Sequence, residues 1–270
     1  MTTVPFRRNF LATAICFALA AAPVFGQDWE STVSPHVPGP FPELRPVHVS
    51  YSFGWNTIPA ATADLSLSKR ADGNLQLDAT GHTIGLARSL WRFDVVHVAV
   101  IDAHTLRPIQ VHETESGHAK KAETEINFTA EGVISRRDEI RGGRVKSKTR
   151  HFEFPMIHGI GSALLYLRTQ PPRPDTVQRI VVYPSTTPYL CTITPAGHEH
   201  ISGPTGVYDA MKLELQLSKI GGKRELLPHK KFEHATVWIS DDPNRLVLRI
   251  EARIFAGAVF AQLQSVRFDQ

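Results

Sequence analysis

The stretch Val47-His-Val-Ser-Tyr-Ser-Phe-Gly-Trp55 decides the fold class. Its large apolar residues occupy every second position and alternate with His48, Ser50, Ser52 and Gly54. A helix cannot place such a set on one face, whereas a β-strand points successive side chains to opposite faces of a sheet. The pattern therefore predicts a strand with one apolar face and one polar face.

The same period of two continues along most of the chain. Two alternating runs, 63–67 and 75–79, are joined through Asp72-Gly73, which indicates a β-hairpin because glycine tolerates the positive φ of the turn. Other runs with strand character are 93–101, 105–114, 122–129, 133–140, 144–154, 177–183, 189–194, 208–217, 235–240, 246–255 and 259–268. This spacing predicts a mainly β fold, an antiparallel barrel or curved sandwich of about twelve strands. A closed barrel and a two-layer sandwich both produce the pattern, which leaves the two open.

Two short segments, 84–91 and 157–167, carry apolar residues at helical spacing instead. We expect one or two short helices there, each capping an open end of the sheet. No linker or repeat divides the later sequence, which predicts a single antiparallel β domain over residues 47–270. Residues 27–46 contain five prolines and few periodic apolar positions, which indicates an extended, poorly packed, Pro-rich lead-in.

The N-terminal residues have the three parts of a secretory signal peptide. Arg7 and Arg8 precede thirteen uncharged residues (10–22), and Pro23-Val-Phe-Gly26 follows. Thirteen helical residues rise about 20 Å, which is less than the roughly 30 Å of a bilayer core. The sequence predicts a signal peptide over residues 1–26, cleaved after Gly26 or, as second choice, after Ala22. No later apolar run reaches bilayer length, so we expect a periplasmic or secreted protein without a membrane span.

Charge and cysteine usage narrow the expected partners. The formal net charge is +4, and removing the two leader arginines leaves +2, too small an excess to predict a nucleic-acid partner. Cys16 leaves with the leader, and Ile15 stands where a lipoprotein signal needs a small residue. Cys191 then remains alone, forms no internal disulfide, and lies in an alternating run typical of a buried small hydrophobe.

Motifs of known catalytic sites are missing from the sequence. It contains no complete phosphate-binding loop, no dinucleotide fingerprint, no Gly-x-Ser-x-Gly elbow in a suitable setting and no His-Glu-x-x-His. We therefore predict no cofactor and no catalytic residue. His198 and His200 would share one side of a strand, as in some metal sites, but spacing identifies no third ligand. They are weak metal candidates, and scattered polar-face histidines are the favoured explanation.

A polar cluster near the C-terminus has two interpretations. Ser240, Asp241 and Asp242 end a predicted strand shortly before Arg245. Two carboxylates beside an arginine are typical of acid–base or ligand groups, and equally of a turn in which aspartate accepts backbone N–H groups. We favour the turn with a local ion pair. Arg168, at the end of the second predicted helix, would bind an anion or, as we favour, complement the helix dipole.

Several short motifs follow one another between residues 45 and 268: Tyr51–Trp55, Thr83–Ala87, Ser162–Arg168, Gly206–Leu213, Trp238–Asp242 with Arg245, and Gly257. Their order and spacing resemble a bacterial secreted family catalogued as domain of unknown function 3108. The resemblance implies an exported, β-rich protein. The family has no established activity, so no catalytic residue carries over from it.

Three functions follow as hypotheses. The first is an exported, non-catalytic envelope protein that binds a hydrophobic or lipid-like ligand inside the β shell. Its pocket candidates are Tyr51, Phe53, Trp55, Trp91, Leu164 and Trp238. The second is a filled-core interaction or scaffold protein of the periplasm, which contacts another envelope protein through the charged hairpin 133–150. The third, least favoured, is a metal-dependent hydrolase that uses His198, His200, Asp241 and Asp242.

Overall fold

The computed structural model describes residues 28–40, 44–170, 176–228, 234–254 and 257–269. The predicted signal peptide, residues 1–26, lies outside these ranges. In chain order the elements are η1 (Trp29–Thr32), β1 (Val47–Trp55), β2 (Ile58–Lys69), β3 (Leu75–Thr83), α1 (Gly85–Leu90), β4 (Phe93–Ile101), β5 (Pro108–Gly117), β6 (Lys121–Phe128), β7 (Gly132–Arg141), β8 (Arg144–Glu153), α2 (Ile160–Thr169), β9 (Gln178–Val182), β10 (Tyr189–Gly203), β11 (Gly206–Ile220), β12 (Leu226–Pro228), β13 (His234–Ser240), β14 (Val247–Ile254) and β15 (Gly257–Phe268). No helix in the described ranges is both long and apolar enough to cross a membrane.

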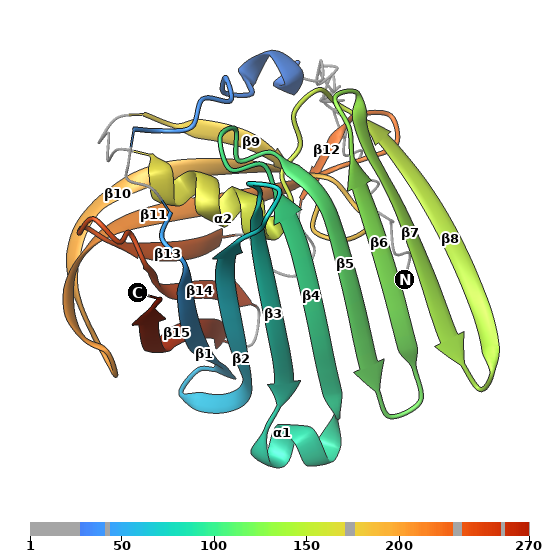
Figure 1. Cartoon of the computed structure of the whole chain (residues 1–270), viewed down its shortest axis with the longest axis horizontal. Helices are drawn as coiled ribbons and strands as arrows, with labels where there is room; N and C mark the ends of the chain where they lie inside the picture. Colours follow the sequence, from blue (N-terminus) through green and yellow to red (C-terminus); the bar gives the residue numbers. More distant parts are fainter. Residues whose placement is uncertain (1–27, 41–43, 171–175, 229–233, 255–256, 270) are drawn as a thin grey trace, which may run out of the picture.

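One antiparallel sheet contains all fifteen strands (Figure 1). The order across it is β8-β7-β6-β5-β4-β3-β2-β1-β15-β14-β13-β11-β10-β9, with β12 beside β11. Strands β1 to β8 run from the middle of the sheet to one edge, and β9 to β15 return from the other edge until β15 pairs with β1. The predicted mainly β, antiparallel fold is confirmed, with more strands than expected.

Helix α2 lies inside the curve of the sheet because of this topology. The chain leaves the sheet at edge strand β8 and enters it again at the opposite edge strand β9, so the connection crosses the inner face and carries α2 with it (Figure 1). Eight of the ten residues of α2 are buried. Leu165 and Leu167 join one core cluster with Ile126 from one arm of the sheet and Ile239 from the other. The helix is therefore the centre about which both arms pack.

The two sheet edges meet without forming a ladder of hydrogen bonds. Within the described residues β8 and β9 are not paired. Instead, the hydroxyl groups of Ser135 and Tyr183 share a buried hydrogen bond of 2.8 Å, and His158 forms an isolated parallel bridge with Val182. The fold is thus a barrel-like single sheet whose edges are joined by one side-chain hydrogen bond and one short backbone bridge, which answers the question of barrel or sandwich that the sequence left open.

Residues 28–40 are packed against the rest of the molecule, unlike the poorly packed lead-in that we expected. Trp29 is 5% exposed, stacks on Phe154 and donates its indole N–H to the carbonyl oxygen of Arg224 at 2.7 Å. Further along, Gly39 passes so close to the end of α2 that a Cβ would lie 1.8 Å from the carbonyl oxygen of Thr169. We call residues 28–40 the strap. The prolines prevent a periodic pattern there, but they do not prevent single side chains from packing.

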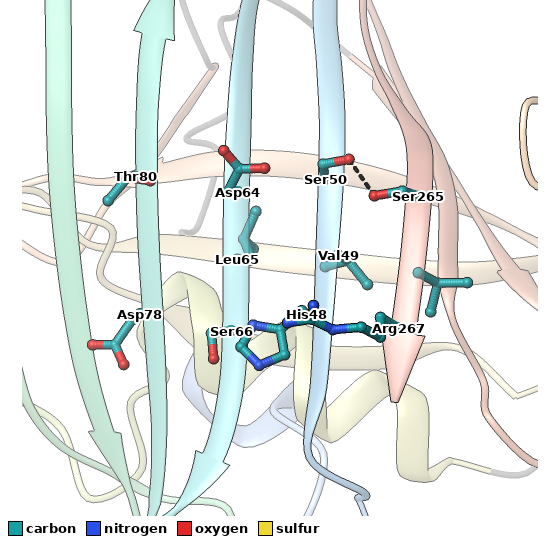
Figure 2. A pocket seen from close by; sticks show the side chains of 11 residues that line it. His48, Val49, Ser50, Asp64, Leu65, Ser66, Asp78, Thr80, Ser265 and Arg267 are labelled. Carbon is teal, nitrogen blue, oxygen red and sulfur yellow. Dashed lines mark hydrogen bonds between the residues drawn. The ribbon is translucent and has the colours of Figure 1, made fainter. Parts of the chain in front are cut away.

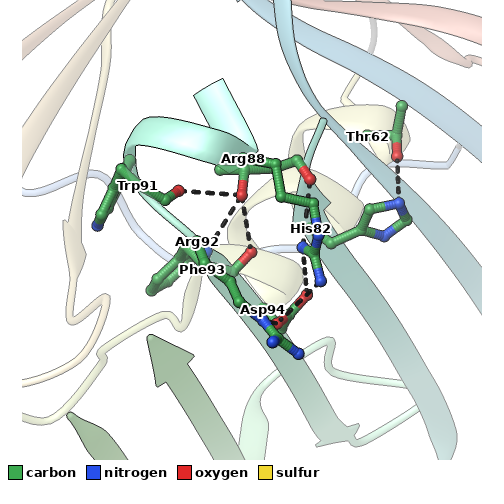
Figure 3. Close-up of polar contacts among 8 residues, drawn as sticks. Thr62, His82, Arg88, Trp91, Arg92, Phe93 and Asp94 are labelled. Carbon is green, nitrogen blue, oxygen red and sulfur yellow. Dashed lines mark hydrogen bonds and ion pairs between the residues drawn. The ribbon is translucent and has the colours of Figure 1, made fainter. Parts of the chain in front are cut away.

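Helix α1 lies at the tip of the β3–β4 hairpin and does not cap the sheet (Figure 1). The Thr83 hydroxyl donates to the carbonyl oxygen of Trp91 at 3.1 Å, and Arg88 forms an ion pair with Asp94 at 2.8 Å (Figure 3). The side chain of Leu90 is 84% exposed. Six residues held at both ends by paired strands are too short to reach over the sheet, and so the expectation of a cap at residues 84–91 is not met.

Candidate functional site

An apolar cavity of about 260 Å³ lies between α2 and the inner face of the sheet. Phe53 and Ile160 line the cavity and are also exposed to solvent, which places its opening beside them. Protein interiors contain few voids larger than a water molecule, so an apolar space of this size is a candidate binding site. Most of its wall is aliphatic and comes from α2, β1, β2, β3 and β14: Val47, Val49, Leu65, Leu67, Leu77, Leu164, Val247 and Ile250.

Three of the six predicted pocket residues line this cavity: Tyr51, Phe53 and Leu164. Tyr51 and Phe53 follow the alternation of β1 that also points Val47 and Val49 inward. The Tyr51 hydroxyl donates to the carbonyl oxygen of Val247 at 2.7 Å. Burial raises the pKa of this phenol to about 12, so the group stays protonated and neutral.

The three tryptophans among the predicted pocket residues lie elsewhere. A β-bulge between Phe53 and Gly54 interrupts the alternation before Trp55, which ends β1 and is exposed. Trp91 follows α1 and stacks on Phe93 with ring centroids 5.3 Å apart.

Trp238 alternates in β13 with Val237 and Ile239, which belong to the main core cluster. Its side chain therefore points to the other face of the sheet. Lys212 and Arg249, its cross-strand neighbours, lie 5.8 and 5.9 Å from its ring centroid. These three tryptophans therefore do not line the cavity.

The predicted polar cluster joins α2 to the turn after β13, and we call it the latch. Arg168 donates from Nε to the carbonyl oxygen of Arg245 and from Nη2 to that of Asn244, each at 2.8 Å. Arg245 donates from Nη2 to the carbonyl oxygen of Gln170 at 2.9 Å and pairs with Asp241 at 3.4 Å. Burial lowers the pKa of both guanidinium groups.

An Asx-type turn completes the latch. One oxygen of Asp242, Oδ1, accepts from the Ser240 hydroxyl at 3.0 Å and from the backbone N–H groups of Asn244 and Arg245 at 2.8 and 3.1 Å. Arg245 has a positive φ of 50°, which is uncommon for a residue with a Cβ. The carboxylates are thus engaged in holding the turn, as in the interpretation that we favoured from the sequence.

The strap is held on α2 by neutral aromatic rings. His36 stacks on Tyr166 with centroids 4.9 Å apart, and His158 lies 5.0 Å from His36. In the described part of the chain, His158 Nε2 and His36 Nδ1 are buried without a hydrogen-bond partner. Burial, together with the neighbouring His36 and Arg107, lowers the pKa of His158 to about 3. A proton on His158 would therefore be buried without a partner beneath the strap.

A second, larger hollow of about 530 Å³ lies on the outer face of β15, β1, β2 and β3 (Figure 2). Most of its lining consists of polar residues that alternate with the cavity lining, such as His48, Asp64 and Asp78, and Val49, Leu65 and Val266 complete it. Ser50 and Ser265 share a hydrogen bond of 2.6 Å across it. The same strands thus present an apolar wall inward and a polar wall outward.

The weak metal candidates His198 and His200 both lie on β10, but they bind different carboxylates. His198 contacts Asp241 at 3.3 Å, and the exposed His200 contacts Asp209 at 2.6 Å. Among the described residues, no three His, Cys, Asp or Glu side chains gather in a way that could hold a metal ion. Cys191 is buried, and burial raises the pKa of its thiol to about 12, so it carries no thiolate at neutral pH.

Apart from Leu164, the aliphatic cavity wall is the part of the site that we did not name from the sequence. On β1, Val47 and Val49 alternate in step with Tyr51, and on β2 their pairing partners are Leu67 and Leu65. Parity and hairpin register together contain that signal. Gly161 of α2 was also missed; it lets the helix approach β3, because a Cβ there would lie 2.6 Å from Leu77 Cδ2.

Comparison with solved structures supports the shared architecture. A β-barrel-like protein of domain of unknown function DUF1849 from Brucella abortus is similar with a TM-score of 0.58 at 5% identity, and the match covers 84% of this chain and 99% of that one. The lipoprotein LppX of Mycobacterium tuberculosis matches with a TM-score of 0.26 at 13% identity, over 84% of this chain and 90% of that one. The first likeness shows a common fold, and the second is too low to carry an argument.

Sequence comparison identifies the family. None of the curated proteins matches the chain. A family model described as a protein of unknown function, DUF3108, matches residues 50–264. This range includes most of β1 and of β15, all of β2 to β14, α2 and the latch. The chain belongs to the DUF3108 family of proteins of unknown function.

Proposed function

We propose that this protein is an exported, non-catalytic binding protein that holds a hydrophobic small molecule in the cavity beneath α2. The observation that carries the proposal is the cavity of about 260 Å³ with an almost wholly aliphatic wall. A hydrophobic ligand placed there leaves water and contacts apolar groups on several sides, which is favourable in proportion to the apolar area removed from water. An unfilled apolar space of this kind costs packing energy when it stays empty.

The cover of the cavity also supports binding. Helix α2 forms one wall, the strap packs on α2, and the latch fixes the end of the helix to the β13–β14 turn. A site that is formed before the ligand arrives binds it with a smaller loss of conformational entropy. The proposal of export rests on the sequence features of residues 1–26 alone. The proposal that residues 47–270 fold as one domain rests on the unbroken strand order of the sheet.

Native mass spectrometry after gentle purification, followed by displacement of a fluorescent fatty-acyl probe, tests the function. We expect either a co-purified hydrophobic molecule or saturable probe binding. The variant Ala261→Phe is designed to fill the cavity from β15, since Ala261 lines it, and we expect it to abolish both signals. Ser265→Leu is the matched control, because Ser265 lies on the same strand but lines the outer hollow.

Two results would end the proposal. One is an unaltered chain with no retained molecule and no probe binding. The other is probe binding that Ala261→Phe leaves intact while Ser265→Leu removes it, because the outer hollow would then be the site. Thermal unfolding of both variants confirms that they fold, and Ala261→Leu replaces the larger substitution if the phenyl ring prevents folding.

A further inference from the structure

One charged side chain reaches the apolar cavity. Among the side chains that line it, Arg168 alone is ionised at neutral pH, and Arg168 is only 9% exposed. It extends from the last turn of α2. Tyr51 lines the same cavity, and the Arg168 charge lowers the pKa of its phenol against the larger effect of burial. The cavity therefore has one cationic end in an otherwise apolar wall.

The charge of Arg168 has no anionic partner at ion-pair distance in the described residues. Its two hydrogen bonds run from Nε and Nη2 to the carbonyl oxygens of Arg245 and Asn244. A guanidinium group has five N–H donors, so these bonds leave three of them for another acceptor. Carbonyl dipoles at the end of α2 offset part of the charge, but a buried cation without an anion remains costly. An anion in the cavity would complete this environment.

The other polar group of the wall, Tyr51, does not compete for that anion. Its proton is donated to the carbonyl oxygen of Val247 at 2.7 Å, so it offers only oxygen lone pairs toward the cavity. Asp242, the acidic side chain whose charge acts on Arg168, already accepts three hydrogen bonds within the latch. Arg168 is therefore the side-chain donor at this end, and its planar group suits a carboxylate in two-point contact.

The volume of the cavity limits the length of the ligand. A space of about 260 Å³ is below the range of roughly 300–1,000 Å³ typical of larger ligands. It therefore favours a ligand with one short aliphatic chain over a lipid with several acyl chains.

We propose that the cavity takes a single-chain aliphatic carboxylate whose head group pairs with Arg168 and whose chain contacts the wall of Val49, Leu65 and Leu77. This inference rests on the proposed function and makes it more specific. The chain would extend from the cationic end toward the opening beside Phe53 and Ile160. Affinity would come from the apolar wall, and selectivity for acids would come from Arg168.

Titration calorimetry of the purified chain with decanoate, 1-decanol and decyltrimethylammonium at neutral pH tests the proposal. These probes share one chain and differ in head-group charge. We expect decanoate to bind at least about tenfold more tightly than 1-decanol, the effect of one charge-assisted contact, and the cationic probe to bind most weakly. Arg168→Met should reduce the affinity for decanoate to that for 1-decanol and leave the alcohol unchanged, whereas Tyr51→Phe should keep the preference for the acid.

The outcomes separate this inference from the proposed function. Equal affinities for decanoate and 1-decanol in the unaltered chain overturn acid recognition while binding in the cavity stands. Failure of all three probes to bind overturns both. If Arg168→Met does not fold, the comparison of the three probes on the unaltered chain still decides, because it needs no substitution.

Discussion

The inner and outer faces of β1, β2 and β3 are built from the same strands and differ in almost every physical property. The inner face is aliphatic, is covered by α2 and encloses about 260 Å³. The outer face carries residues such as His48, Asp64 and Asp78 and borders the larger hollow of about 530 Å³ in Figure 2. The comparison teaches that cover and polarity, rather than size, distinguish the candidate site. A hydrophobic molecule gains little from a wall that water already solvates.

Loss of the latch should give the largest change in the free energy of unfolding. It tests whether the stability of the inner face depends on the helix α2 that covers it. Arg245 is 1% exposed. The substitution Arg245→Met would remove the hydrogen bonds that Arg245 donates to the Gln170 carbonyl oxygen and to Asp241. We expect the free energy of unfolding to fall by about 3–5 kcal/mol, measured by urea titration. Arg70→Met is the matched outer control: its ion pair with Asp72 is exposed and is worth at most about 1 kcal/mol. Equal losses in the two variants would contradict the comparison.

Acid should destabilise the packing of the strap on α2 before it destabilises the outer face of the sheet. His158 has a folded pKa of about 3, lowered from 6.5, so the unfolded chain binds its proton first as the pH falls. Its contribution to stability is complete above pH 6.5 and is lost progressively toward pH 3, by about 3 kcal/mol at pH 4. Unfolding free energy measured against pH checks this, with His158→Gln expected to flatten the loss and the outer-face variant His48→Gln to keep it. A profile that His158→Gln leaves unchanged would refute the assignment.

A smaller effect is expected from a substitution that reduces the volume of the cavity. Gly161→Ala places a methyl group against Leu77 Cδ2, and the side chain of Leu77 can turn into the cavity that it lines. We expect the affinity for the acyl probe to fall several-fold while stability changes by less than about 1 kcal/mol, because alanine favours the helix. Probe titration and thermal unfolding measure the two effects. An unchanged affinity would show that this part of the cavity holds no ligand.

The smallest effect is expected far from the cavity, on the exposed edge strand β8. Lys146→Glu with Lys148→Glu should change stability by at most about 0.5 kcal/mol, since both side chains are exposed. Chemical unfolding checks the value. The scaffold hypothesis for the hairpin 133–150 predicts, in contrast, that this charge reversal removes a partner from pull-down experiments.

Much of the sheet could be predicted because period-two alternation is a local property. The runs at 47–55 and 93–101 coincide with β1 and β4. The second half of β10 was missing from the predicted runs, whereas most of β11 was predicted as 208–217. Residues 195–200 have no apolar alternation, and a register shift lies between Pro195 and His198. Those residues are held in a strand by pairing with β11, which is a tertiary effect.

The site itself was predictable only in part. Parity placed Tyr51 and Phe53 inward, but the same rule, applied to Val237 and Ile239, would have placed Trp238 outward. The burial of Trp29 depends on contacts with Phe154 and Arg224, both distant in sequence, and no local pattern contains them. Whether the interior is hollow depends on side-chain volumes and the approach of α2 to β3 at Gly161, which only the assembled fold determines.

Methyl NMR of the purified chain during titration with decanoate tests the central claim most directly. Binding beneath α2 predicts saturable shifts of the methyl signals of Leu77, Leu164 and Val247, which line the cavity. The exposed Val96 and Val207 should remain unshifted. Shifts confined to residues outside the cavity, or no saturable shift at any decanoate concentration below micelle formation, would contradict the account.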